Sequence, residues 1–203
     1  MQKKAYHHGN LEENLIEAGL SLVDKEGLEN LSLRRIAAGC GVSHAAPYKH
    51  FSSKEELLDK MQKYVEECFA DKLEEAYENA EQNKDAMISM AQAYLRFFSE
   101  KPQYFRFFQR QQGDAQVNLS NMSRESNYRP FEVFKSAAVK RLEALGLPDT
   151  VRDETIIAMW AMVHGCTSIS VMSSVRYDGD WAELLRSILQ NNMTVRGHDH
   201  DRQ

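Results

Sequence analysis

Residues 32–54 read SLRRIAAGCGVSHAAPYKHFSSK, and this stretch decides the fold. Ser32 is a favoured N-cap residue, and the apolar residues that follow it share one face of a short helix. Gly39 and Gly41 then allow a sharp turn, because glycine adopts positive φ without a Cβ clash. Ser43 can cap a second helix. A helix, a short glycine-containing turn and another helix make a helix-turn-helix.

The same stretch is a basic island in an acidic chain. It holds four Lys or Arg residues, two His residues and no Asp or Glu, although the 203-residue chain has a net charge of −5. Residues 1–54 carry seven basic against six acidic residues, whereas residues 55–203 carry eighteen against twenty-four. Phosphate neutralisation needs such a local patch, so any nucleic-acid contact is expected near the N-terminus.

The order of short motifs in this region resembles the DNA-binding domain of TetR-family transcriptional repressors. The matching motifs are Gly41-Val42-Ser43, Tyr48-Lys49-His50-Phe51 and Ser53-Lys54-Glu55-Glu56-Leu57. Because several elements match in sequence, the resemblance is far more specific than a lone helix-turn-helix pattern. It implies a homodimer that binds a double-stranded DNA operator.

The recognition helix is expected at about residues 43–51, kept short by Pro47 in its first turn. Its first residues would face base edges, which histidine can read and alanine can touch only at a thymine methyl. Its later residues and Lys54, at the positive end of the next helix, would contact phosphates. Arg35 stands where the family often has an acidic residue, and is expected to add positive charge near DNA. The predicted DNA-binding residues are Ser32, Arg34, Ser43, His44, Ala45, Ala46, Tyr48, Lys49, His50 and Lys54.

The remainder of the chain predicts an all-α protein, because apolar residues recur at helical spacing and no strand-like alternation is present. We expect a three-helix DNA-binding domain over 1–54 and a long connecting helix over 55–84. A helical effector-binding and dimerisation bundle is expected over 85–195, and a disordered tail over 196–203. Residues 1–9 are either a frayed terminus or a basic arm that lies against DNA.

Ten of the chain's aromatic residues lie between Tyr94 and Phe134. They are either a helical core or the lining of a small-molecule pocket. Trp160, His164 and Gly165 resemble the Trp, His and Gly of the WHG-type C-terminal domain found in a subset of TetR-like regulators. His164 could equally be a satisfied core histidine. The predicted ligand-binding residues are Tyr94, Phe98, Phe105, Phe108, Phe131, Phe134, Trp160 and His164.

The two last helices are expected over about 149–175 and from residue 181 onward. The first is apolar on more than one face, which predicts burial. The family resemblance implies that this pair joins its counterpart from a second subunit in a four-helix bundle.

Other classes of protein find little support in the sequence. No apolar run is long enough to span a membrane, and the first residues lack the apolar segment of a secretory signal. Three widely spaced cysteines favour a reducing cytoplasm, with Cys40 as a core residue or, alternatively, a redox sensor. Glycine-rich phosphate loops, nucleophile elbows and metal-ligand motifs are absent, so no catalytic residue, cofactor or metal site is predicted.

The expected function is therefore a sequence-specific repressor that binds a pseudo-palindromic operator as a homodimer and leaves it when a small-molecule effector binds. Two alternatives stay open. One is a DNA-binding protein without an effector. The other is a helical small-molecule-binding protein that does not bind DNA.

Overall fold

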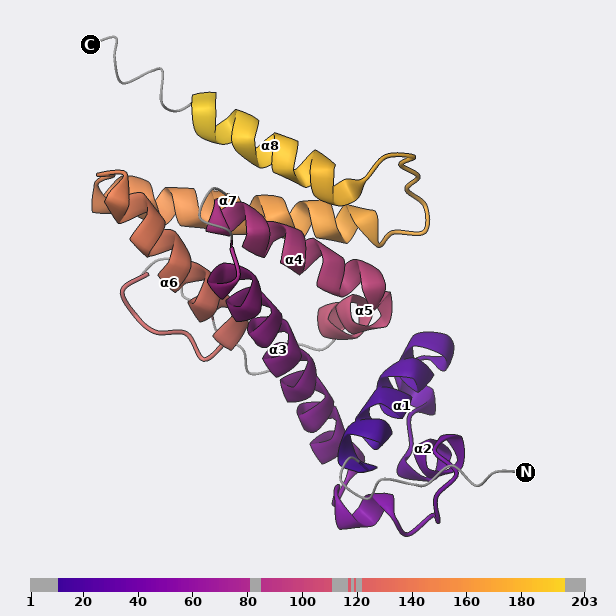
Figure 1. Ribbon diagram of the computed structural model, residues 1–203. Coiled ribbons are helices and arrows are strands. Elements are labelled where there is room, and N and C mark those ends of the chain that lie inside the picture. Colours follow the sequence, from indigo (N-terminus) through magenta and orange to yellow (C-terminus); the bar gives the residue numbers. More distant parts are fainter. Residues whose placement is uncertain (1–10, 81–84, 111–116, 118, 120–121, 196–203) are drawn as a thin grey trace. The chain divides into compact units, whose positions relative to one another are not determined.

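The computed structural model describes residues 11–80, 85–110, 117, 119 and 122–195 (Figure 1). All regular elements of this described part are helices and it contains no strand, which confirms the all-α prediction. The elements in chain order are α1 (Leu11–Glu26), η1 (Leu28–Asn30), α2 (Leu33–Gly39), η2 (Pro47–Lys49), α3 (Lys54–Glu78), α4 (Ala86–Glu100), α5 (Pro102–Arg110), α6 (Arg129–Ala144), α7 (Asp149–Ser170) and α8 (Trp181–Val195).

Packing divides the described residues into two units. The first holds the residues up to Val65 together with Arg106–Arg110, and the second holds Glu66–Phe105 and the described residues from 117 onward. The helices α3 and α5 each contribute residues to both units. The predicted basic arm and the predicted disordered tail lie outside the described residues, and the predicted domain limits stay predictions.

The first unit is built around the apolar faces of α1 and α2. Leu15, Leu20, Ile36 and Phe51 are almost completely buried, and each such side chain contributes roughly 1.5–3 kcal/mol by leaving water. The helix α1 ends before Gly27, whose φ of 87° suits only a residue without Cβ. These buried side chains fix the position of the turn that follows α2.

Two polar caps set where the helices of the first unit begin. The hydroxyl of Ser32 accepts a hydrogen bond from the backbone N–H of Arg35, as predicted for the N-cap of α2. The hydroxyl of Ser53 accepts from the backbone N–H of Glu56, which starts α3. The carboxylate of Glu56 reaches back to the backbone N–H of Ser52 at 2.6 Å, one residue earlier than a simple capping box would require.

The C-terminal part of α5, which belongs to the first unit, is fastened to α1. Arg106 donates to both carboxylate oxygens of Asp24, at 2.6 and 2.9 Å. This hydrogen bonding from Arg106 lowers the pKa of Asp24 below its usual value. A bidentate arginine–carboxylate pair fixes orientation as well as distance.

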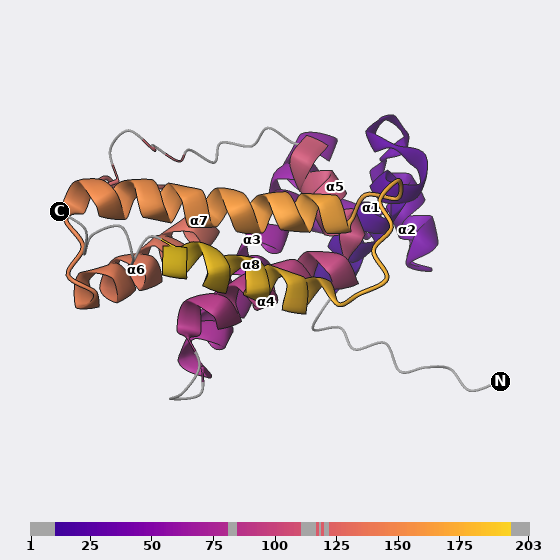
Figure 2. The same cartoon turned by 90° about the horizontal axis from the view of Figure 1, so that it is seen from above.

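In the second unit, α4 packs against α7 and α8, and α6 packs against α7 (Figures 1 and 2). Asp85 caps α4, because its carboxylate accepts from the backbone N–H of Met87 at 2.9 Å. The helix α7 ends at Ser170, before the predicted limit near residue 175. The Ser170 hydroxyl donates to the carbonyl of Thr167 at 2.8 Å, and such local bonds compete with the helical backbone pattern.

The start of α6 is held to the second half of α3 by one arginine. Arg129 lies 2.7 Å from a carboxylate oxygen of each of Glu67, Asp71 and Glu74. These three acids share one face of α3, since they are spaced four and three residues apart. Single exposed ion pairs contribute about 0–1 kcal/mol, but a network around one guanidinium also fixes the geometry.

Candidate nucleic-acid interface

The predicted recognition helix is shorter in the structure than the sequence suggested. A single 3₁₀ turn, Pro47–Lys49, replaces the α-helix expected over residues 43–51. The backbone N–H groups of Ala46 and Lys49 bond to carbonyls three residues earlier, at 2.9 and 3.2 Å. Pro47 has no N–H to continue an α-helical pattern, and it is itself buried, so the segment stays a tight turn.

The turn before this segment uses one of its two glycines for its backbone freedom. Gly41 has a φ of 67°, a backbone conformation that residues other than glycine rarely adopt. Among the described glycines, Gly39 is not one of those with positive φ, and a Cβ added there would meet open space. Gly41 is therefore the residue that sets the sharp turn after α2.

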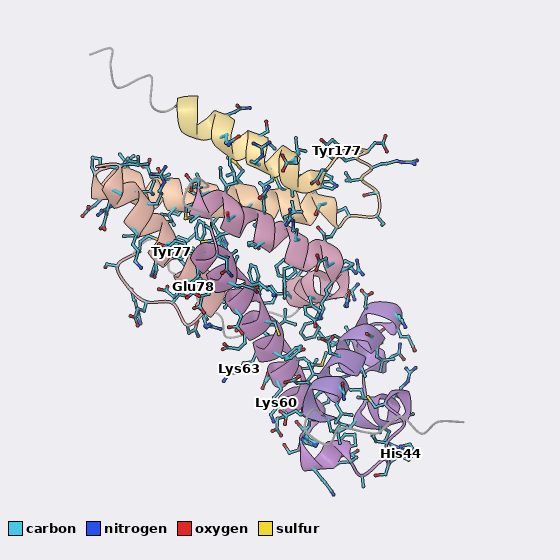
Figure 3. The ribbon with its side chains drawn as sticks, viewed as in Figure 1. His44, Lys60, Lys63, Tyr77, Glu78 and Tyr177 are labelled. Atoms are coloured by element: carbon cyan, nitrogen blue, oxygen red, sulfur yellow. The ribbon has the colours of Figure 1, made fainter. Side chains whose placement is uncertain are left out.

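The ten predicted DNA-binding residues all lie in the first unit, between α2 and the start of α3. Six of them are exposed: Arg34, Ser43, His44, Ala45, Tyr48 and Lys49. The other four, Ser32, Ala46, His50 and Lys54, are half-buried. Tyr48 is 56% exposed, unusually high for an aromatic side chain, and His44 lies at the edge of the first unit (Figure 3). An exposed aromatic side chain beside exposed cations suits contact with a negatively charged partner.

Neighbouring arginines on α2 differ in their surroundings. Among the described residues, Arg34 has no carboxylate partner, and the same holds for Lys49 in the 3₁₀ turn. Arg35, in contrast, lies 2.6 Å from the carboxylate of Glu26 and donates to the carbonyl of Asn30 at 3.3 Å. The positive charge that Arg35 was expected to add near DNA is therefore paired with a carboxylate of the same unit, and its contribution to DNA binding stays a prediction.

His50 also has an internal partner. Its Nδ1 lies 3.2 Å from one carboxylate oxygen of Glu12, and the Nζ of Lys60 lies 2.8 Å from the other. The hydrogen bond from Lys60, and to a smaller degree that from His50, lower the pKa of Glu12. Lys60 donates as well to the His50 carbonyl at 3.2 Å. This arrangement orients the His50 ring toward α1.

Lys54 and Cys40 are both held by backbone groups. The Nζ of Lys54 donates to the carbonyl of Leu28 at 2.8 Å, which positions the ammonium group without neutralising it. The Sγ of Cys40 lies 3.5 Å from the carbonyl of Asn14, and burial raises the pKa of its thiol. A raised pKa makes the reactive thiolate scarcer, which supports a packing role for Cys40.

Seven of the eight predicted ligand-binding residues form one cluster in the second unit. Trp160 of α7 lies with its ring centroid 5.1–5.4 Å from those of Tyr94, Phe131 and Phe134. His164 lies 5.4 Å from Phe105, which in turn lies 5.1 Å from Phe98. The eighth residue, Phe108, belongs to the first unit.

The polar pair in this cluster is Tyr94 and His164. The Tyr94 hydroxyl and the His164 Nδ1 are 2.8 Å apart. Burial raises the pKa of Tyr94 and lowers that of His164, so both groups are neutral at pH 7. The phenol can then donate to Nδ1, which leaves the proton of the imidazole on Nε2.

A groove of about 1320 Å³ lies elsewhere in the second unit, between α3, α4 and α8. None of the eight predicted ligand-binding residues lines it. The groove instead follows one face of α4, from Asp85 to Glu100, and includes Arg96 and Phe97. Sequence reasoning missed it, although two small residues spaced four apart on α4, Ser89 and Ala93, were a partial signal.

The described residues lack two features of other protein classes. No helix among them has the length and hydropathy that crossing a membrane requires. The same residues also contain no group of three or more His, Cys, Asp or Glu side chains that could bind a metal ion. An exposed, partly uncompensated basic helix-turn-helix joined to an all-helical second unit defines a class of DNA-binding regulators.

Comparison with known proteins identifies the family. Residues 15–61 match the family described as "Bacterial regulatory proteins, tetR family". Residues 87–191, more than half of the chain, match the family described as "Tetracyclin repressor-like, C-terminal domain". The chain belongs to the TetR family of transcriptional regulators, a class without enzymatic activity whose members bind DNA as dimers. The WHG-type resemblance is compatible with the second match.

Similar proteins agree with this assignment. The nucleoid occlusion factor SlmA of Serratia proteamaculans is 24% identical over 206 residues, covering 94% of this chain and all of that protein. A TetR regulator from Legionella pneumophila has a similar fold, with a TM-score of 0.63, 17% identity and coverage of 92% and 99%. The TetR-family regulator PfmR from Thermus thermophilus has a TM-score of 0.59, 20% identity and coverage of 86% and 93%.

Proposed function

We propose that this protein is a transcriptional repressor that binds a pseudo-palindromic operator as a homodimer and releases it when a small molecule binds the second unit. The observation that carries the proposal is the pair of uncompensated cations, Arg34 and Lys49, on either side of the exposed turn of a TetR-family helix-turn-helix. Free cations contribute to affinity because each releases counterions from a phosphate.

Different side chains of the helix-turn-helix would contact DNA bases and DNA phosphates. His44, Ala45 and Ala46 precede the 3₁₀ turn and would face base edges, where only the histidine can form hydrogen bonds. Lys49, Arg34 and Lys54 would contact phosphates and set the register on the duplex. His44, Ala45 and Ala46 form what we call the reading segment. Because only one of them can form side-chain hydrogen bonds, we expect DNA shape to contribute to the choice of operator.

Dimerisation through α7 and α8 is supported by apolar side chains that face outward. Ile169 and Met172 are 43% and 48% exposed, and Ala161 and Gly165 lie on the same face of α7. Leu184 and Ile188 of α8 are half-exposed at helical spacing. Burying these faces against a second copy would give a two-fold dimer, and such dimers read half-sites about 34–36 Å apart, or a multiple of that distance.

Release by an effector requires a path between the two units. A ligand shifts the equilibrium only if it binds one conformation more tightly than the other. The helices α3 and α5 continue from one unit into the other, so a ligand that displaces either helix in the second unit would act on the first. The aromatic residues around His164 are the place that the sequence predicts for such a ligand. The cytoplasm, where the operator lies, is the proposed location of the protein.

Packing of the aromatic cluster favours a second candidate, a DNA-binding protein without an effector. Tyr94, Phe98, Phe105 and Phe131 are each no more than 4% exposed, as expected for the side chains of a packed core. In that case no small molecule would change the affinity for DNA.

The proposal is tested by fluorescence anisotropy with DNA from the region upstream of the protein's own gene and with scrambled DNA. Site-selective, salt-sensitive binding of a dimer is expected. A double variant, Arg34→Gln with Lys49→Gln, should bind at least about tenfold more weakly, because charged hydrogen bonds contribute about 1.5–3 kcal/mol each. Tight ligand binding without any DNA binding by the unaltered protein would instead identify a helical small-molecule-binding protein.

A further inference from the structure

The groove between α3, α4 and α8 is lined by a few small side chains among longer, mostly polar ones. Ala76 lies in the last turn of α3, Ala80 follows the end of that helix, and Ser89 and Ala93 lie four apart on α4. Residues four apart share a helix face, so α4 presents a shallow strip to the groove. This strip leaves a hollow that longer side chains would fill.

The floor of the groove has an apolar part of defined length. Ile88, Ala93 and Phe97 all line it from α4. The half-buried ring of Phe97 stacks on Phe69 with centroids 5.3 Å apart and an interplanar angle of 26°, which fixes its orientation. From Ile88 to Arg96 the helix advances by about 12 Å, at 1.5 Å per residue.

Of the three cations that line the described part of the groove, two are paired with a carboxylate and one is not. Lys72 pairs with Glu75 at 2.5 Å, and Arg186 pairs with Glu183 at 2.6 Å. Arg96 is exposed and has no carboxylate partner among the residues that the structure describes.

The acidic residues of the groove are only partly paired with its cations. Asp85 pairs at 3.2 Å with Arg141, which does not line the groove. Glu75 by its hydrogen bond, and Glu100 by its charge, raise the pKa of Lys72, so Glu100 acts on a lysine of the same groove. Arg96 is therefore the cation that a bound anion would find unpaired within the described part of the groove.

We propose that this groove binds an amphipathic organic anion, with its carboxylate held by Arg96 and its apolar body lying along Phe97, Ala93 and Ile88. A guanidinium group suits this role, because its planar fork matches a carboxylate with two parallel hydrogen bonds. The apolar floor is long enough for a body of about 12 Å. A ligand without the anionic group would gain the apolar contacts but leave Arg96 unpaired.

The regulatory part of this inference rests on the proposed function. Lys72 and Ala76 of α3 form one wall of the groove, and Arg186 of α8 belongs to the other. The helix α3 begins in the first unit, while α8 is part of the proposed dimer face. A bound anion would thus contact both the helix that leads to the reading segment and the helix that holds the two subunits together.

Isothermal titration calorimetry of the full chain with 4-phenylbutyrate and with 4-phenylbutylamine tests the site. The two probes have similar shape and opposite charge. We expect the acid to bind and the amine to bind at least about tenfold more weakly. Arg96→Gln should weaken binding of the acid by about tenfold or more, since it removes a charge-assisted hydrogen bond. Ala93→Trp should abolish binding by filling the hollow, and Arg176→Gln, on an exposed residue outside the groove, should change nothing.

Equal binding of the acid and the amine, or binding of the acid that survives both groove substitutions, would overturn the assignment. Operator affinity is measured in the same preparations by anisotropy. Absence of operator binding with retained calorimetric binding contradicts the proposed function and leaves the groove assignment standing. Binding of the acid that leaves operator affinity unchanged overturns the effector role of the groove.

Discussion

The Tyr94 hydroxyl lies 2.8 Å from His164 Nδ1 within a cluster of aromatic rings. Burial lowers the pKa of His164 below its usual 6.5, so the native protein holds the imidazole neutral. In the unfolded chain the same group takes up a proton near pH 6.5. The unfolded state therefore binds more protons as pH falls, and the stability contributed by the neutral form is lost below about pH 6.5.

A first prediction follows for the pH dependence of stability. His164→Asn keeps an acceptor near the position of Nδ1 but cannot be protonated. The melting temperature of the unaltered protein should fall more between pH 7.5 and pH 5.5 than that of the variant. Differential scanning fluorimetry at the two pH values checks this. An equal fall in both proteins would mean that protonation of His164 is not coupled to unfolding.

The second prediction concerns the dimer. A Cβ added at Gly165 would meet no atom within 4 Å in the monomer, so Gly165→Leu should fold and even gain helix propensity. In a dimer through α7 and α8 the same side chain would meet the partner. Light scattering after size exclusion should show a monomer with unchanged helical circular dichroism. Gly39→Leu, equally open but in the first unit, should stay dimeric. A dimeric Gly165→Leu protein would argue for another interface.

The third prediction compares adjacent arginines. Arg34 has no carboxylate partner among the described residues, whereas Arg35 is paired with Glu26 at 2.6 Å. Arg34→Gln should weaken operator binding and reduce the slope of log K against log salt by about 0.9 for each phosphate that a subunit no longer neutralises. Arg35→Gln should leave the slope unchanged. Anisotropy titrations at several salt concentrations measure both, and the opposite ranking would exclude the assignment of Arg34 to phosphate.

The fourth prediction separates base reading from phosphate contact. His44→Ala should change the preferred operator sequence, because it removes the hydrogen-bonding side chain of the reading segment. Lys54→Ala should weaken binding evenly across sequences, since phosphates carry no sequence information. Binding selections from a randomised operator library compare the two variants. An altered preference in Lys54→Ala with none in His44→Ala would reverse the assigned roles.

Local sequence patterns predicted the helices well. Ser32 caps α2 as expected, because a capping signal acts over a few residues. The recognition segment was placed at residues 43–51 but was expected to be an α-helix, and the structure has a 3₁₀ turn there because Pro47 has no N–H for the α-helical pattern.

The charge pattern predicted less of the candidate site. Arg35 and Arg34 look alike in the sequence, but the partner of Arg35 lies nine residues away on another helix. His50 and Lys60 meet Glu12 across 38 and 48 residues. Such pairs depend on the tertiary packing of α1 against the helix-turn-helix. The groove was not predicted either, because the sequence does not show which segments face each other in the fold.

The pairing of Arg35 with Glu26 also bears on how the protein would search a genome. Attraction between free cations and phosphates is independent of base sequence, and it sets how long a protein stays on any stretch of DNA. A helix-turn-helix that compensates part of its own charge holds random sequence less tightly. Its residence time on non-specific DNA would therefore be short, and it would move along DNA by repeated dissociation and rebinding more than by sliding. Stable binding would then require both subunits of the dimer to contact an operator.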